Sequence, residues 1–141
     1  MAATIGVLLV DDFQPFRTFV TSLFGGNGYV FYEASDGLEA VAKAQELQPD
    51  LILLDIHLPK LNGLEVARRL RELAPSLKIV FFTLDSSAVI QEALSLGAGY
   101  VAKMQAGADL PAALTAVLQG ERFVSSGLDD DRLGWKTYLS G

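Results

Sequence analysis

The sequence predicts an α/β fold in which helices cover both faces of a doubly wound, five-stranded parallel sheet with strand order 2-1-3-4-5. Two observations predict it. Five short apolar runs alternate along the chain with segments of helical spacing. Several of these runs are apolar without alternation, which is typical of strands buried on both faces. Right-handed crossovers between parallel strands then place helices on both sides of the sheet.

The five apolar runs are the expected strands. They cover residues 5–10, 29–34, 51–54, 78–82 and 99–102. The runs "LILL" and "IVFF" are continuously apolar, as in central parallel strands. The run "YVFYEAS" mixes polar and apolar residues, so we expect it to form an edge strand.

Between the strands, apolar residues recur at the i, i+3, i+4, i+7 spacing of an amphipathic helix. This spacing predicts helices within residues 16–24, 37–47, 66–73, 89–94 and 110–118. Pro15 suits the first turn of a helix. Residues suited to cap helix amino termini precede three of the helices: Ser35 or Asp36, Asp85 or Ser86, and Asp109.

The composition indicates one acidic domain with room for a core. The 141 residues are 50% hydrophobic and 20% charged. Lys and Arg number 11 against 17 Asp and Glu, for a net charge of −6, which argues against direct nucleic-acid binding by this domain. There is no cysteine, and no apolar run nears the roughly 20 residues of a membrane helix. We therefore expect a cytoplasmic protein without a membrane segment.

Carboxylates follow two of the expected strands. Asp11 and Asp12 follow the first strand, and Asp55 follows the third. In the order 2-1-3-4-5 these strands are neighbours, so the three carboxylates converge at the edge where α/β sheets bind ligands. Like charges at close quarters need a compensating cation. Mg²⁺, which binds through one or two carboxylates together with waters and phosphate oxygens, is the expected cofactor.

Two further polar residues reach the same edge. Thr83 follows the fourth run and Lys103 the fifth. A carboxylate nucleophile, a metal and donors for the remaining charge are what phosphoryl transfer requires. Singly, a threonine or lysine at a strand end is ordinary, but the ordered set predicts phosphoryl chemistry.

Over residues 5–124 the chain resembles the receiver domain of two-component response regulators, which implies a flavodoxin-like fold. The matching pieces are the pair Asp11 and Asp12, Asp55 in "LILLDIHLPKLNG", Thr83, and Tyr100 with Lys103 in "GAGYVAK". The stretch "GAGYVAK", followed by "LPAALTAVLQGERFVSSGL", is further similar to the NarL/FixJ-type subfamily. Many members of that subfamily carry a C-terminal helix-turn-helix.

The resemblance implies that Asp55 accepts a phosphoryl group from the phosphohistidine of a histidine kinase or phosphotransfer protein. It also implies that Asp12 and Asp55, with the main-chain carbonyl of His57, hold Mg²⁺. Asp11 would act partly through water.

The resemblance also implies a switch around the phosphoryl group. Lys103 would pair with the acceptor or its phosphate, Thr83 would turn its hydroxyl toward the phosphoryl oxygens, and Tyr100 would swing inward behind it. A hydrogen bond from Thr83 to that anion is worth about 1.5–3 kcal/mol, enough to shift a two-state loop. Three neighbouring residues are candidates for tuning phosphate lifetime: His57, Leu84 and Asp85.

We expect a receiver domain over residues 1–124 and a polar tail with no recognisable fold over 125–141. The chain is either a stand-alone receiver or the receiver piece of a longer regulator, and homodimers are compatible with either. Two alternative functions stay open. One is a docking module that has lost phosphorylation. The other is a magnesium-dependent aspartyl phosphohydrolase, whose second acid would have to stand where this chain has His57.

Overall fold

The computed structural model describes residues 4–26, 28–84 and 90–125, and there it has six strands and five α-helices. The strands are β1 (Ile5–Val10), β2 (Tyr29–Ala34), β3 (Leu51–Asp55), β4 (Lys78–Thr83), β5 (Gly99–Ala102) and β6 (Phe123–Val124). The α-helices are α1 (Gln14–Ser22), α2 (Gly37–Leu47), α3 (Gly63–Leu73), α4 (Ile90–Leu96) and α5 (Ala106–Leu118). A short 3-10 helix, η1 (Lys103–Gln105), joins β5 to α5.

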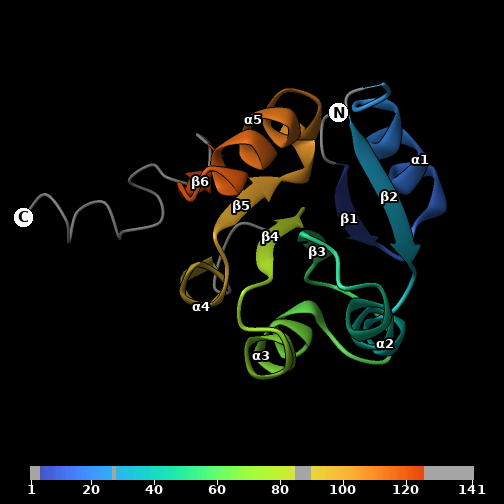
Figure 1. Cartoon of the computed structure of the whole chain (residues 1–141), viewed down its shortest axis with the longest axis vertical. Coiled ribbons are helices and arrows are strands. Elements are labelled where there is room, and N and C mark those ends of the chain that lie inside the picture. The colour runs from blue at the N-terminus through green and yellow to red at the C-terminus, as the bar shows by residue number, and fades with distance from the viewer. Residues whose placement is uncertain (1–3, 27, 85–89, 126–141) are drawn as a thin grey trace, which may run out of the picture.

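The strands form one parallel sheet in the order β2-β1-β3-β4-β5-β6. The predicted doubly wound order is confirmed, and β2 lies at an edge of the sheet as predicted. Strand β6 was not predicted, because a pair of residues is too short to show any periodicity. It adds a sixth strand beside β5 (Figure 1).

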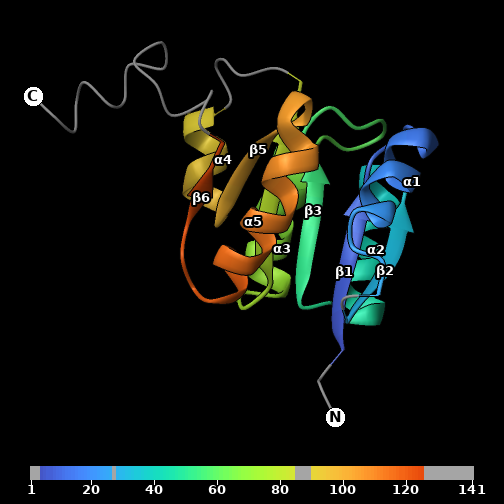
Figure 2. The ribbon, with the colours of Figure 1, turned by 90° about the horizontal axis from the view of Figure 1, so that it is seen from above.

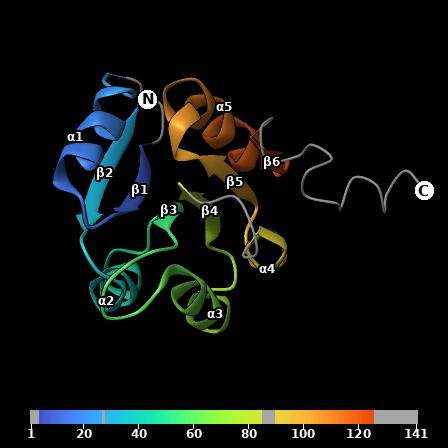
Figure 3. The same ribbon diagram turned by 180° about the vertical axis from the view of Figure 1, so that it is seen from behind.

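Helices cover both faces of the sheet. Helices α1 and α5 lie on one face and α2, α3 and α4 on the other, as the front and rear views both show (Figures 1 and 3). Successive side chains of a strand point to opposite faces. In β1, Val7 and Leu9 therefore join the core beneath α1 and α5, whereas Leu8 and Val10 join the core beneath α2 and α3. Burial on both faces explains the continuous apolar runs.

Two of the predicted helix starts are confirmed and one is wrong. Pro15 lies in the first turn of α1. Asp36 caps α2, where its side chain accepts a hydrogen bond from the Glu39 N–H at 2.8 Å. Asp109 does not cap the last helix, because α5 already begins at Ala106 and the Asp109 carboxylate accepts a hydrogen bond from elsewhere. The predicted cap at Asp85 or Ser86 lies outside the described residues.

Within the part of the chain that the structure describes, no helix has the length and apolar character needed to cross a bilayer.

Candidate functional site: an acidic crevice at the carboxyl edge of the sheet

Three carboxylates meet where the central strands end. Asp11 and Asp12 directly follow β1, Asp55 ends β3, and the two strands are parallel neighbours. Figure 2 shows their arrows pointing the same way. One oxygen from each carboxylate lies within 4.8 Å of the other two. Asp11 and Asp55 are buried and Asp12 is exposed. The predicted convergence of the three acids is therefore confirmed.

Lys103 is the cation of the crevice. Its Nζ lies 2.7 Å from Asp11 Oδ2 and 3.2 Å from Asp55 Oδ2. The same ammonium lies 4.9 Å from the ring centroid of Phe16 and 5.1 Å from that of Phe82. Aromatic faces at this distance attract a cation. The aromatic rings and the two acids thus hold the lysine head group between β1 and β3.

Neighbouring groups shift the pKa of the Asp55 carboxyl in opposite directions. Burial, the largest influence, raises its pKa; the Lys103 ammonium lowers it, and the charge of Asp11 raises it again. The main-chain N–H of His57 also donates a hydrogen bond to Asp55 Oδ1 at 3.2 Å. A buried acid with only one neighbouring cation is stabilised by a further positive charge.

The main chain around Asp55 is fixed by the start of α3. A Cβ atom added to Gly63 would lie 2.2 Å from the main-chain oxygen of Asp55. The Gly63 N–H donates a hydrogen bond to the Ile56 carbonyl at 2.8 Å. Only glycine allows this close approach, so Gly63 helps to set the position of the acid.

The donor set fits a divalent metal. Asp11 Oδ1 accepts a hydrogen bond from the Phe13 N–H at 2.8 Å, while Oδ2 is buried and contacts Lys103 without the direction of a hydrogen bond. Among the described residues, that oxygen has no hydrogen-bond donor. Carboxylate oxygens are the ligands that Mg²⁺ prefers. Asp11, Asp12 and Asp55 are therefore a group that could bind such an ion.

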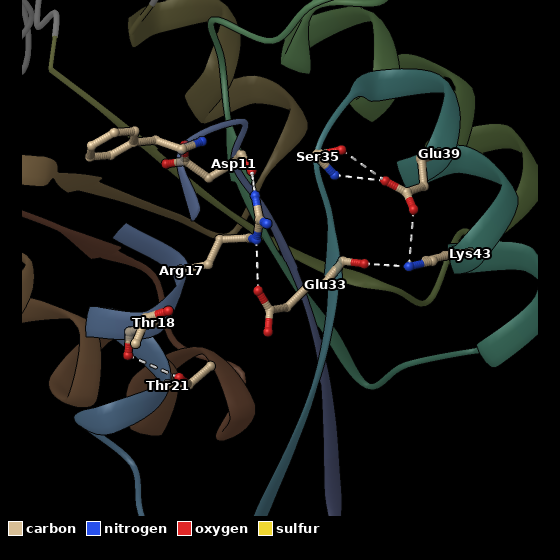
Figure 4. A network of polar contacts seen from close by, with 9 residues as sticks. Asp11, Arg17, Thr18, Thr21, Glu33, Ser35, Glu39 and Lys43 are labelled. Atoms are coloured by element: carbon tan, nitrogen blue, oxygen red, sulfur yellow. Dashed lines mark hydrogen bonds and ion pairs between the residues drawn. The ribbon is translucent and has the colours of Figure 1, made fainter. Parts of the chain in front are cut away.

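A polar network supports the β1 side of the crevice (Figure 4). The Arg17 guanidinium, on α1, donates to the Asp11 carbonyl at 2.5 Å and to Glu33 Oε1 on β2 at 2.6 Å. Lys43 Nζ, on α2, donates to the Glu33 carbonyl at 2.5 Å and pairs with Glu39 Oε2 at 3.1 Å. The peptide between the two site acids is thus tied to three neighbouring elements.

The remaining predicted site residues lie on or beside the same edge. Thr83 ends β4 and is 1% exposed. The Tyr100 ring is fully buried, 6.4 Å from the Phe81 ring, so in this structure it already occupies an inward position. His57 is exposed, and Leu84 is 71% exposed. Asp85 lies outside the described residues.

Sequence reasoning missed three residues that act on the site's main chain. They are Arg17, Asp109 and Ser125. Arg17 had a weak signal, since it is a basic residue among the apolar positions of an amphipathic helix close to the acids. Ser125 had none, because a single serine after a helix is typical of any turn.

A hollow at the opposite edge of the sheet is a weaker candidate for the functional site than the crevice. It has a volume of about 1010 Å³ and lies among residues at or just before the starts of β1, β3 and β4, Asp50 and Lys78 among them. Asp50 Oδ2 already accepts a hydrogen bond from the Gly6 N–H at 2.8 Å. The convergent charges of the crevice make it the candidate site.

A parallel sheet that gathers three acids, a lysine and a threonine at its carboxyl edge defines a class of phosphoacceptor signalling domain. The family of the response regulator receiver domain matches residues 7–115. The chain belongs to this family, and its role is that of a phosphoacceptor in two-component signalling.

Proteins of similar sequence support this family assignment. The chain is similar to the transcriptional activator protein ExaE of Pseudomonas putida, with 36% identity over 88% of this chain and 60% of the relative. It is 39% identical to the nitrate/nitrite response regulator protein NarL of Escherichia coli K12, over 86% of this chain and 58% of the relative. The chain thus spans less than two thirds of these relatives' length.

Solved structures give the same fold. A two-component response regulator of the LuxR family from Aurantimonas sp. SI85-9A1 superposes with a TM-score of 0.84 and 32% identity, covering 89% of this chain and 93% of that one.

Proposed function

We propose that Asp55 accepts a phosphoryl group from the phosphohistidine of a histidine kinase or phosphotransfer protein. The observation that carries the proposal is the Lys103 ammonium, which lies within 3.2 Å of Asp55 Oδ2 and 2.7 Å of Asp11 Oδ2, with Asp12 in reach of both acids. An acid buried next to a fixed cation is a suitable nucleophile for phosphorus.

In this proposal Asp12 and Asp55, with the main-chain carbonyl of His57, hold Mg²⁺, and Asp11 acts partly through water. When bound, the ion would neutralise the charge of the phosphoryl oxygens. The chain's own contribution is positional. The His57 N–H donates to one Asp55 oxygen, and the Lys103 ammonium donates to the other, so both oxygens are held in fixed directions.

In the proposed transfer, an Asp55 oxygen forms a bond to phosphorus while the bond from phosphorus to the donor's imidazole nitrogen breaks. The electron pair of that bond returns to the imidazole. Lys103 and the Thr83 hydroxyl then face the three phosphoryl oxygens. The new group carries about two negative charges, which attract the Lys103 ammonium and the Thr83 hydroxyl. We therefore expect the positions of these two side chains to change with phosphorylation. We propose that Thr83 and Tyr100 transmit this change to the face formed by α4, β5 and α5.

Exposed apolar side chains around the crevice support docking of a protein phosphodonor. Phe13, Leu84 and Met104 follow β1, β4 and β5, and are 62%, 71% and 86% exposed. Apolar groups gathered around a charged site are typical of protein interfaces. We propose that the donor's helices pack against them, and that His57, Leu84 and Asp85 tune the lifetime of the phosphoryl group.

The output of the whole protein is also proposed by analogy. Relatives named as a transcriptional activator and a response regulator support a role in regulating transcription. We further propose that the protein acts in the cytoplasm and that it can form homodimers. The acidic domain itself would not bind nucleic acid. The predicted division into a receiver over 1–124 and a tail over 125–141 is part of the same proposal.

Acetyl phosphate with Mg²⁺ tests the chemistry, and intact-mass spectrometry reads it. We expect one added phosphoryl group, lost in Asp55→Asn. Asp36→Asn is the matched control, since an asparagine also caps a helix and the adduct should survive. A wild-type chain without an adduct would instead be a docking module, and rapid turnover of a phosphoester would indicate a phosphohydrolase. The decay rate of the adduct is then compared between wild type and His57→Ala. A changed rate would support the proposed tuning by His57, and an unchanged rate would contradict it.

A further inference from the structure

Strand β6 closes the edge of the sheet next to β5 (Figures 1 and 3). The Phe123 N–H donates to the Ala98 carbonyl at 3.2 Å, and the Ser125 N–H donates to the Tyr100 carbonyl at 2.9 Å. The side chain of Val124 packs against the core cluster that contains Tyr100. The segment 123–125 is therefore a part of the folded sheet, although the family match ends at residue 115.

The Ser125 hydroxyl joins three elements at the end of this segment. Ser125 is 0% exposed. Its Oγ accepts a hydrogen bond from the Ala102 N–H at 3.0 Å and donates one to Asp109 Oδ2, in the first turn of α5, at 2.6 Å. A hydroxyl that donates to a carboxylate makes a strong, charge-assisted bond. The serine oxygen is therefore held in place, and it holds the end of β5.

The residue whose N–H is held, Ala102, directly precedes Lys103 in the chain. The residue after Ala102 is the lysine whose ammonium lies between Asp11 and Asp55. We propose that Ser125 is a positioning residue for Lys103, and that docking of residues 123–125 on β5 is coupled through it to the charge at Asp55. The coupling to phosphorylation rests on the proposed role of Asp55.

The coupling works in both directions, because linked equilibria are reciprocal. A phosphoryl anion gives the Lys103 ammonium a stronger partner and so restrains the main chain that carries it. The Ala102 N–H then stays aligned with the serine oxygen, and residues 123–125 stay docked. Conversely, without the hydroxyl the Lys103 main chain is less restrained, and its ammonium meets the incoming phosphoryl group less often in the right place.

The same segment also reaches α4. The Arg122 guanidinium donates to the carbonyl of Leu94 at 2.5 Å. Residues 122–125 thus contact α4, β5 and α5. A change in the docking of this segment therefore acts on three elements beside the crevice.

Ser125→Ala tests the positioning role in the unphosphorylated protein. We expect hydrogen exchange at the Ala102 amide to become about tenfold faster or more, because its acceptor is gone. Amides of β1 and β3 should be unchanged. Ser22→Ala is the matched control, because its exposed hydroxyl bonds only the Phe19 carbonyl of its own helix. Equal exchange at Ala102 in the two variants would overturn the positioning role, whether or not Asp55 is phosphorylated.

The rate of phosphorylation by acetyl phosphate separates positioning from general weakening. We expect Ser125→Ala to react about three- to tenfold more slowly, with Mg²⁺ affinity within about twofold of wild type, because the hydroxyl touches no acid of the crevice. Asp109→Asn keeps an acceptor for the serine and should lose less of the rate. An unchanged rate in Ser125→Ala would overturn the coupling while leaving Asp55 as acceptor.

The reverse direction is tested with beryllofluoride and Mg²⁺ as the phosphoryl mimic. Exchange at the Ser125 amide should slow on addition of the mimic in wild type and in Ser22→Ala, but not in Ser125→Ala or Asp55→Asn. Exchange that is unchanged or faster in a wild-type protein that binds the mimic would overturn the coupling. If wild type binds no mimic, the proposed function fails, and the exchange at Ala102 still decides the positioning role.

Discussion

Two sets of hydrogen bonds support the crevice, one toward the β2 edge of the sheet and one toward the β6 edge, and they use different chemical groups. On the β2 side, Arg17 donates to the carbonyl of Asp11, one residue before Asp12. On the β6 side, Ser125 accepts from the N–H of Ala102, one residue before Lys103. Each support therefore fixes the main chain next to a charged residue of the site.

The difference lies in charge and exposure. The Arg17 side chain is 13% exposed and its partner Glu33 is 45% exposed, so solvent reaches this pair. Ser125 is fully buried, and its partner Asp109 is half-buried. The bond that touches the site's main chain has a charged donor on the Arg17 side and joins two neutral groups, the Ala102 N–H and the Ser125 hydroxyl, on the other side. A hydrogen bond with a charged donor is the stronger of these two kinds. The acid side of the crevice is thus held more firmly, and the lysine side is the one that can respond to phosphorylation.

The largest effect is expected from Arg17→Met. It removes the donor to the Asp11 carbonyl and leaves Glu33 without its ion pair, at a cost of about 2–3 kcal/mol in the free energy of unfolding. Mg²⁺ binding should weaken severalfold, because the peptide that orients Asp12 is less restrained. Urea unfolding and calorimetric titration with Mg²⁺ measure the two effects.

Lys43→Met is the control for Arg17→Met. Lys43 also contacts Glu33, by donating to the Glu33 carbonyl, but it has no hydrogen bond or ion pair with any of the three acids of the crevice (Figure 4). Its side chain is 36% exposed, so we expect a cost of at most about 1 kcal/mol and unchanged Mg²⁺ affinity. Equal costs for the two variants would mean that the bond to the Asp11 carbonyl adds nothing to the support.

A smaller effect is expected from Asp55→Asn, and its sign depends on pH. Burial raises the pKa of Asp55 above its usual value, against the opposing influence of Lys103. As pH rises, the unfolded chain therefore releases this proton first, and stability is lost between the ordinary and the raised pKa. Without metal, Asp55→Asn should be about 1 kcal/mol more stable than wild type at pH 7, and the gain should vanish below a pH of about 3.9.

Asp36→Asn has the opposite sign. The bond from the Glu39 N–H, the largest influence, lowers the pKa of Asp36. Its carboxylate therefore stabilises the fold above its ordinary pKa, and that contribution is lost as pH falls through the lowered value. Urea unfolding between pH 3 and 8 compares the two variants. A loss of stability at pH 7 in Asp55→Asn would show that the ion pair with Lys103 outweighs the burial of the acid.

The strands and the convergence of the acids could be predicted because they follow from local patterns. Continuous apolar runs mark buried parallel strands, and parallel strands end at one edge, so Asp11, Asp12 and Asp55 had to meet. The ends of the fourth and fifth apolar runs placed Thr83 and Lys103 at the same edge, and the resemblance to a known family then implied their roles.

The supports could not be predicted, because each joins residues whose contact depends on packing. Ser125 meets Ala102 only because β6 pairs with β5, and a strand of two residues leaves no periodic signal. Asp109 looked like a helix cap, but it lies within α5 and binds Ser125 instead. Cap patterns show where a helix could begin and cannot exclude an earlier start that tertiary contacts stabilise.

The smallest expected effect concerns salt, and it separates the two supports most directly. Double-mutant cycles with Arg17→Met and Glu33→Gln, and with Ser125→Ala and Asp109→Asn, isolate one coupling free energy for each pair. At low salt we expect about 0.5–1 kcal/mol for the Arg17 pair, falling toward zero at about 1 M salt, because the Debye length shrinks to about 3 Å and Glu33 is accessible to ions. The coupling of Ser125 with Asp109 should change by less than about 0.3 kcal/mol, because the buried hydroxyl carries no charge. Equal salt dependence in the two cycles would show that exposure does not distinguish the supports. Both sides of the crevice would then respond alike to phosphorylation.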